Sequence, residues 1–89
     1  MTIQLEDTAT GVCDALALVA HRPATELRLD ADLANDLSLD SLAMIELSVA
    51  LEERFGITMP AGASPEDLRI RTVADVVRFV EQRRAEVRR

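Results

Sequence analysis

The sequence predicts an all-α fold, a small bundle of three main helices with one additional short helix. Apolar residues recur at intervals of three and four over three long stretches, which places them on one face of a helix. Apolar residues make up 48% of the chain but only Phe55 and Phe79 are aromatic, so we expect a core of Leu, Val, Ile and Ala. The 89 residues are expected to form one domain, residues 1–89, with a modest core.

The first helix is expected at about residues 5–20. Pro23 ends it, because proline cannot continue a helix. Cys13 is the single cysteine, so no internal disulfide can form, and we interpret it as a small buried hydrophobic residue. The apolar residues at helical spacing are Leu5, Ala9, Val12, Cys13, Leu16 and Val19.

Residues 22–40 are predicted to form a long loop between the first and second helices. A connection of this length without regular structure is unusual in a compact domain. Leucine recurs through it, however, and buried leucines would pin it to the bundle, so we expect the loop to be ordered. These leucines are Leu27, Leu29, Leu33, Leu37 and Leu39.

The second helix is expected at about residues 41–55 and ends at Gly56, a residue that favours the C-terminal position. It carries a core face and, nearly opposite, a second apolar set with glutamates beside it. Carboxylates are rarely fully buried without a partner, so we interpret the second set as a partly exposed strip, typical of a docking surface. The core face comprises Met44, Leu47, Leu51 and Phe55, and the second set comprises Leu42, Ile45 and Val49 with Glu46, Glu52 and Glu53.

A short third helix is expected at about residues 65–69, because Ser64 is a good N-cap and Pro65 suits the first helical position. The last helix is expected at about residues 72–86, where Thr72 and Asp75 have the spacing of a capping box. Its apolar stripe comprises Val73, Val76, Val77, Val80 and Val87, and its terminal arginines, Arg83, Arg84, Arg88 and Arg89, are expected to be solvated and frayed.

The net charge of −6 argues against nucleic acid and anionic membrane surfaces as partners. Residues 30–53 contain seven acids and no base, whereas seven arginines occur from Arg69 onward. The acidic block would steer a basic partner toward the second helix. No apolar run reaches the roughly 20 residues needed to span a bilayer and no secretory signal is visible, so we expect a soluble, monomeric, cytoplasmic protein.

The sequence predicts neither an enzyme nor a metal site. His21 is the only histidine, no glycine-rich phosphate loop occurs, and no His or Cys residues have metal-ligand spacing. Paired carboxylates are present, but a small bundle offers no evident pocket to hold a substrate between them. A single histidine near a helix end is more often a surface residue than a catalytic base.

Ser41 lies where the loop meets the second helix, and two interpretations are open. As a plain N-cap, its hydroxyl would accept a hydrogen bond from a helix amide. As a site of covalent modification, it would carry a phosphate ester beside free N–H groups and the positive end of the helix dipole. The neighbouring Asp40 and Leu42 would give a modifying enzyme a charge and an apolar contact.

The chain contains the motif Leu39-Asp40-Ser41-Leu42, continued by Glu46-Leu47, Leu51-Glu52-Glu53, Phe55 and Pro60. With this motif the sequence resembles the acyl carrier protein family over about residues 12–80. The resemblance implies that Ser41 carries 4′-phosphopantetheine, added from coenzyme A by a phosphopantetheinyl transferase. It implies that acyl groups, held as thioesters on this arm, pass to ketosynthases, acyltransferases or other acyl-processing enzymes with basic docking patches.

The resemblance also implies which residues contact partner enzymes. Acidic residues before and along the second helix match the family's acidic positions, and the exposed apolar residues match its partner contacts. The residues so assigned are Asp36, Asp40, Leu42, Ile45, Glu46, Val49, Glu52 and Glu53.

Three departures from the family pattern indicate a specialised carrier. Ala43 stands where many members have an acid, Arg54 interrupts the acidic run, and the connection at 60–70 is longer than the compact form. Together with the lysine-free composition, they favour polyketide or other specialised biosynthesis over fatty-acid biosynthesis.

Two alternative functions are open. An aminoacyl or peptidyl carrier usually shows a Gly-Gly-His/Asp-Ser-like approach to the serine, which Ser38-Leu39-Asp40-Ser41 lacks. A non-covalent interaction module would use Ser41 only as a cap and the acidic helix as a protein-binding surface.

Overall fold

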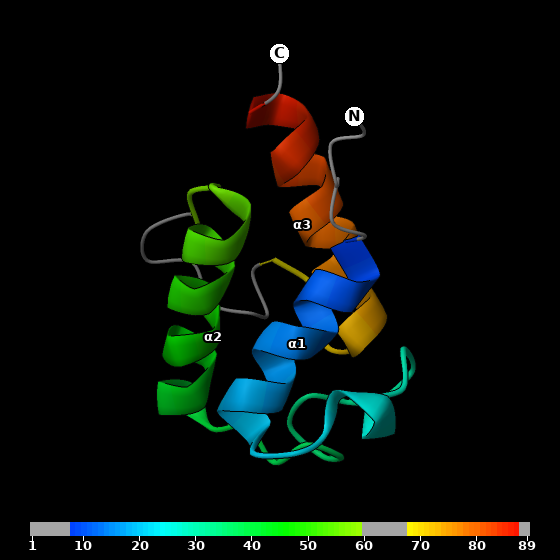
Figure 1. Ribbon diagram of the computed structural model, residues 1–89. Helices are drawn as coiled ribbons and strands as arrows, with labels where there is room; N and C mark the ends of the chain where they lie inside the picture. The colour runs from blue at the N-terminus through cyan, green and yellow to red at the C-terminus, as the bar shows by residue number, and fades with distance from the viewer. Residues whose placement is uncertain (1–7, 60–67, 88–89) are drawn as a thin grey trace.

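The computed structural model describes residues 8–59 and 68–87 and confirms the all-α prediction. Within these ranges, α1 (Thr8–Ala20), α2 (Ser41–Phe55) and α3 (Val73–Val87) are the α-helices, and η1 (Ala24–Glu26) is a single 3-10 turn (Figure 1). α2 spans the same residues that its periodicity predicts. The described residues form no strand beyond one isolated bridge between Asp32 and Thr72.

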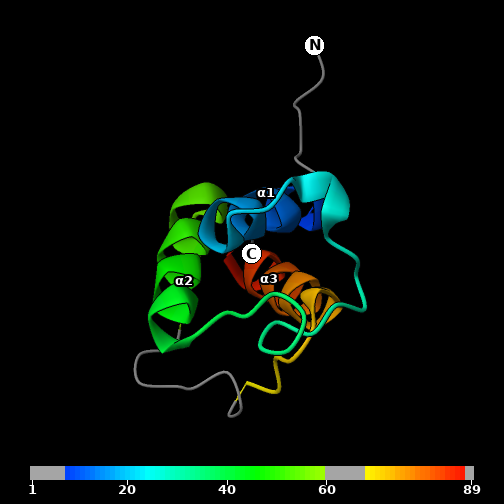
Figure 2. The ribbon, with the colours of Figure 1, turned by 90° about the horizontal axis from the view of Figure 1, so that it is seen from below.

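The core is aliphatic and lies where the three helices face one another (Figure 2). Residues at helical spacing supply it from each helix, and leucines and isoleucines of the connections close it. Burying each of these larger side chains contributes about 1.5–3 kcal/mol. The buried residues are Val12, Ala15 and Leu16 of α1, Leu47 and Leu51 of α2, Val73, Val76 and Val80 of α3, and Leu27, Ala31, Leu33, Leu37, Leu39, Ile57 and Ile70 of the connections.

The loop between α1 and α2 is tied to the segment that precedes α3. Leu33 N–H donates to the Arg71 carbonyl at 2.8 Å, and Val73 N–H donates to the Ala31 carbonyl at 3.1 Å. Four of the five loop leucines are buried, as their recurrence predicts, but Leu29 is 53% exposed. At Leu29 the backbone makes the contact instead, since its carbonyl accepts from the N–H of Ala74.

The predicted short helix at 65–69 falls mainly outside the described residues. Residues 65–67 are not described, and Leu68 and Arg69 form a turn.

Two arginines near the end of α3 contact neighbouring elements. Arg83 donates to the Thr58 carbonyl at 2.7 Å. Arg84 donates to the Thr8 hydroxyl at 2.9 Å and places its guanidinium 5.0 Å from the centre of the Phe55 ring. The prediction of a frayed, solvated end is therefore wrong for Arg83 and Arg84, because both side chains reach neighbouring elements; Arg88 and Arg89 lie outside the described residues.

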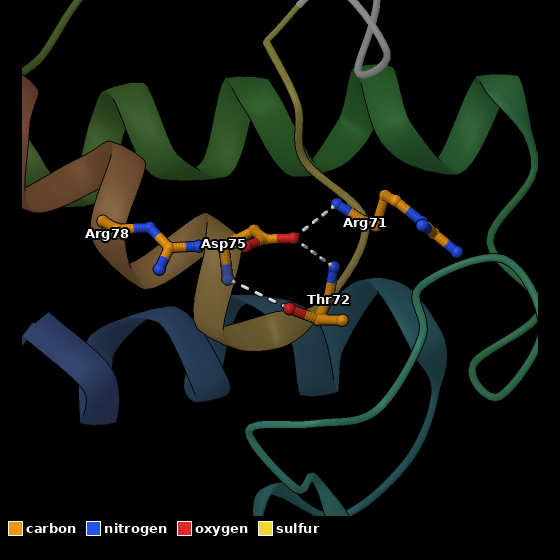
Figure 3. Close-up of polar contacts among 4 residues, drawn as sticks. All are labelled: Arg71, Thr72, Asp75 and Arg78. Atoms are coloured by element: carbon orange, nitrogen blue, oxygen red, sulfur yellow. Dashed lines mark hydrogen bonds and ion pairs between the residues drawn. The ribbon is translucent and has the colours of Figure 1, made fainter.

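Helix α3 begins with the predicted capping box (Figure 3). Thr72 Oγ1 accepts from the Asp75 N–H at 3.2 Å, and Asp75 Oδ2 accepts from the N–H groups of Thr72 at 3.1 Å and Arg71 at 3.0 Å. Arg78 pairs with the same carboxylate. The N–H of Arg71, more than the other contacts, lowers the pKa of Asp75 below its ordinary value, because it stabilises the charged form.

Because the pKa of Asp75 is lowered in the folded state, its contribution to the free energy of unfolding depends on pH. The contribution is complete above the unfolded-state pKa of about 3.9 and is lost as the pH falls through the lower folded-state pKa. We expect Asp75→Asn to reduce the free energy of unfolding at pH 7 by about 1 kcal/mol and to flatten its decline below about pH 4. Urea unfolding across this pH range measures both effects.

Glu81→Gln is the matched control, because Glu81 is an exposed residue of the same helix. It should leave both the neutral-pH stability and its acid dependence unchanged. An Asp75→Asn protein that kept the wild-type decline below pH 4 would contradict this role of Asp75.

Candidate functional site

Asp40, not Ser41, caps helix α2. Asp40 has extended backbone angles, and its Oδ1 accepts from the Ala43 N–H at 2.8 Å. Ser41 is the first helical residue, so the interpretation of Ser41 as a plain N-cap is wrong. Aspartate is itself a preferred N-cap, which is the sequence signal that could have identified it.

Ser41 is exposed, and its hydroxyl makes no hydrogen bond with any residue that the structure describes. The first amides of a helix have no intrahelical acceptor, and Asp40 occupies only that of Ala43. The N–H groups of Ser41 and Leu42 therefore add their partial positive charge beside this hydroxyl. The arrangement suits a phosphate ester on Ser41, because an anion at this point meets free donors.

The loop before Ser41 is fixed by its own carboxylates. Asp32 Oδ1 accepts from the N–H groups of Ala34 at 2.9 Å and Asn35 at 2.8 Å. Asp36 Oδ2 accepts from the Asp32 N–H at 2.8 Å. Asp36, predicted as a partner contact, thus also holds the loop in place while it stays exposed.

An exposed apolar strip follows Ser41 along α2, as the sequence predicts. Its members lie at helical spacing and leave 47–64% of their surfaces in solvent. Two exposed glutamates lie on the same side of the helix. We name this surface the docking face, after the role that the sequence predicts for it; it comprises Leu42, Ile45, Glu46, Val49 and Glu53.

Glu52 and Arg54 point to other parts of the protein. Glu52 is half-buried, and its Oε2 accepts from the N–H of Met59 at 2.8 Å, which fixes the segment after α2. Arg54 pairs with Asp14 of α1 at 3.0 Å. From the sequence, Glu52 was predicted to contact partners, and Arg54 was interpreted as an interruption of the acidic run. In the structure, each binds another segment of the chain, Glu52 through a hydrogen bond and Arg54 through an ion pair.

A cleft of about 690 Å³ opens beside Ser41. It is bounded by α2, the loop before it, and residues from 68 to 79. It extends along α2 from Ser41 to Leu51, about 15 Å at 1.5 Å per residue. Met44, predicted as a core residue, is half-buried and lines it. No local sequence pattern predicts this cleft, because three separate segments form it.

The described residues contain no group of three or more His, Cys, Asp or Glu able to hold a metal ion. Among the same residues, no helix is long and apolar enough to cross a membrane. His21 is exposed after the end of α1, with a left-handed φ of 59°.

Comparisons with known proteins identify the family of this chain. Residues 10–80 match the sequence model of a family described as "Phosphopantetheine attachment site". The acyl carrier protein of Acidothermus cellulolyticus is 32% identical over 80 residues, which cover 90% of this chain and 92% of that protein. That of Thermobifida fusca is 27% identical over 92% of this chain and 100% of its own.

A third relative has a more specific name. The meromycolate extension acyl carrier protein of Mycobacterium leprae is 30% identical over 83 residues, which cover 92% of this chain and 69% of that protein.

The cap and the serine can be separated by mutation. We expect Asp40→Ala to lower the free energy of unfolding by about 1 kcal/mol, the usual cost of losing a helix N-cap. Ser41→Ala should change it by less than about 0.5 kcal/mol, since Ser41 accepts no helix amide. Urea denaturation of the two variants beside the wild type measures the difference, and equal losses would contradict the assignment of Asp40 as the cap.

Proposed function

The chain belongs to the acyl carrier protein family, and from this premise we propose that Ser41 is the attachment site of its phosphopantetheine. The protein is accordingly a non-catalytic carrier with a covalently attached prosthetic group. The observation that carries the assignment is an exposed serine at the first position of α2, in the lining of a mainly apolar cleft. The arm supplies a thiol that holds acyl groups as thioesters.

Attachment uses groups of this chain that make no hydrogen bond with the described residues. A bond forms between Ser41 Oγ and the phosphorus of the phosphopantetheine portion of coenzyme A, the bond from that phosphorus to the nucleotide portion breaks, and the hydroxyl proton leaves. The free N–H groups of Ser41 and Leu42 then stabilise the phosphate charge. Asp40 orients this helix start through its bond to Ala43.

Acyl-processing enzymes and a phosphopantetheinyl transferase are the partners that the family implies. We place their contact on the docking face. Leu42, Ile45 and Val49 supply its apolar centre, and Glu46 and Glu53 supply charge that attracts basic patches. Such contacts are weak and salt-sensitive, which suits a carrier that must leave each enzyme after transfer.

The pathway we favour is polyketide or another specialised chain-elongation pathway. Ala43 leaves the first turn of α2 without an acid, and the chain contains no lysine. The similarity to a carrier named for meromycolate extension supports a specialised role, with fatty-acid biosynthesis as the alternative. The net charge of −6 opposes binding to anionic membranes, which supports action in the cytoplasm.

Ser41 should be the only residue modified by a broad-specificity phosphopantetheinyl transferase supplied with coenzyme A. Intact-mass spectrometry should show one phosphopantetheinyl group on the wild type and none on Ser41→Ala, which lacks the acceptor oxygen. Ser48→Ala is the matched control, because Ser48 lies two helical turns along α2 and should not affect modification. An unmodified wild type, or a modified Ser41→Ala protein, would contradict attachment at Ser41.

The docking face should govern the rate of this modification. We expect Glu46→Lys with Glu53→Lys to lower kcat/KM for a transferase with a basic patch on the order of tenfold at low salt, because steering is reversed. The difference should shrink as salt screens the charges. Glu26→Lys with Glu81→Lys makes the same charge change at exposed residues elsewhere and should have a much smaller effect. Equal effects of the two double variants would refute the docking face.

A further inference from the structure

Leu18 is an exposed apolar residue that the proposed function leaves without a role. It has 73% of its surface in solvent, more than any other large hydrophobic residue that the structure describes. It lies on α1, whereas the apolar residues of the docking face lie on α2. A single exposed leucine is common on protein surfaces, so its meaning depends on what lies beside it.

Leu18 is on the side of α1 that faces α2. It follows Asp14 by four residues, a spacing that places two side chains on the same side of a helix. Asp14 reaches across to α2, where it pairs with Arg54 at 3.0 Å. Leu18 therefore lies one turn further along the same side of α1.

The two helices run in opposite directions. Arg84 contacts both Thr8 at the start of α1 and Phe55 at the end of α2, so these two positions lie at one end of the bundle. Figure 1 shows α1 beside α2, with the C-terminal end of α1 toward the start of α2. Leu18, two residues before the end of α1, therefore lies toward the first half of α2, which carries Leu42.

The apolar strip of the docking face is too narrow to serve as a whole interface. From Leu42 to Val49 it is about 10 Å long, on a helix about 10 Å wide. Even a small protein–protein interface covers roughly 600 Å² of each partner. An enzyme that docks on α2 must therefore also cover a neighbouring element, and α1 packs against α2 on the side of Leu18.

We propose that Leu18 is an apolar contact for the phosphopantetheinyl transferase that modifies Ser41. The inference rests on the proposed attachment at Ser41. The transferase must bring its reacting groups to the serine oxygen itself, because no arm is yet present to span a distance. Enzymes that act on the loaded arm meet its distal end and can dock further away. The transferase therefore covers the surface around the start of α2, the end of the bundle at which Leu18 lies.

The test measures kcat/KM of a broad-specificity phosphopantetheinyl transferase with coenzyme A and the full apo-chain. Leu18→Gln should lower kcat/KM about tenfold, mainly through KM, because the contact is made on binding. The loss should persist as the salt concentration rises, since apolar burial is not screened as charge pairs are. Leu18→Met keeps an apolar side chain of similar volume and should recover most of the loss.

Leu29→Gln is the matched control, because Leu29 is also exposed, at 53%. It lies in the loop between α1 and α2 beside the start of α3, where its carbonyl accepts from the N–H of Ala74. The control should keep the wild-type kcat/KM. Equal losses for the two glutamine variants would overturn the inference, and so would a Leu18→Gln loss that disappears at high salt.

Intact mass measured on each protein separates this inference from the proposed function. If the wild type gains no phosphopantetheinyl group, or Ser41→Ala gains one, attachment at Ser41 has failed. If the group is attached at Ser41 and Leu18→Gln is modified as fast as the wild type, attachment stands and the role of Leu18 is refuted.

Discussion

The core of this protein buries only one face of α2. The opposite face, with its apolar side chains, therefore stays exposed to solvent. Leu47 and Leu51 are 2% exposed, whereas Leu42 and Ile45 on the other side are at least 60% exposed. Each exposed side chain forgoes about 1.5–3 kcal/mol of burial in the isolated protein. Part of that free energy would become available if a partner covered the strip. One face of α2 therefore stabilises the fold, and the other is the surface that we propose for binding.

Local sequence patterns were sufficient for the described parts of the three long helices and for the position of Ser41 at the start of α2. Periodicity identified the range of α2 and its two faces, because burial on one side imposes a 3.6-residue repeat. The capping box of Thr72 and Asp75 was readable because both partners lie within one turn. The exposure of Ser41 was also expected, although the residue that caps α2 is its neighbour Asp40.

Contacts between distant segments could not be predicted from local sequence patterns. Arg83 donates to the Thr58 carbonyl, and Glu52 accepts from the N–H of Met59. Each residue lies in a charged stretch of sequence, for which exposure to solvent is the ordinary expectation. The cleft is even less predictable from local sequence, because α2, the preceding loop and the start of α3 form it together.

The two ends of α2 are held differently. Near its last turn, Arg84 contacts both the Phe55 ring and the Thr8 hydroxyl, so a single side chain joins all three helices. Ser41 lies at the other end, about 21 Å away at 1.5 Å per residue, where the helix borders the cleft. The first turn of α2 is held by the loop before it, through the cap of Asp40 and the bond from the Leu39 N–H to the Leu33 carbonyl. A group attached to Ser41 would therefore extend from a fixed point of the fold, at the end of α2 opposite to the contacts of Arg84.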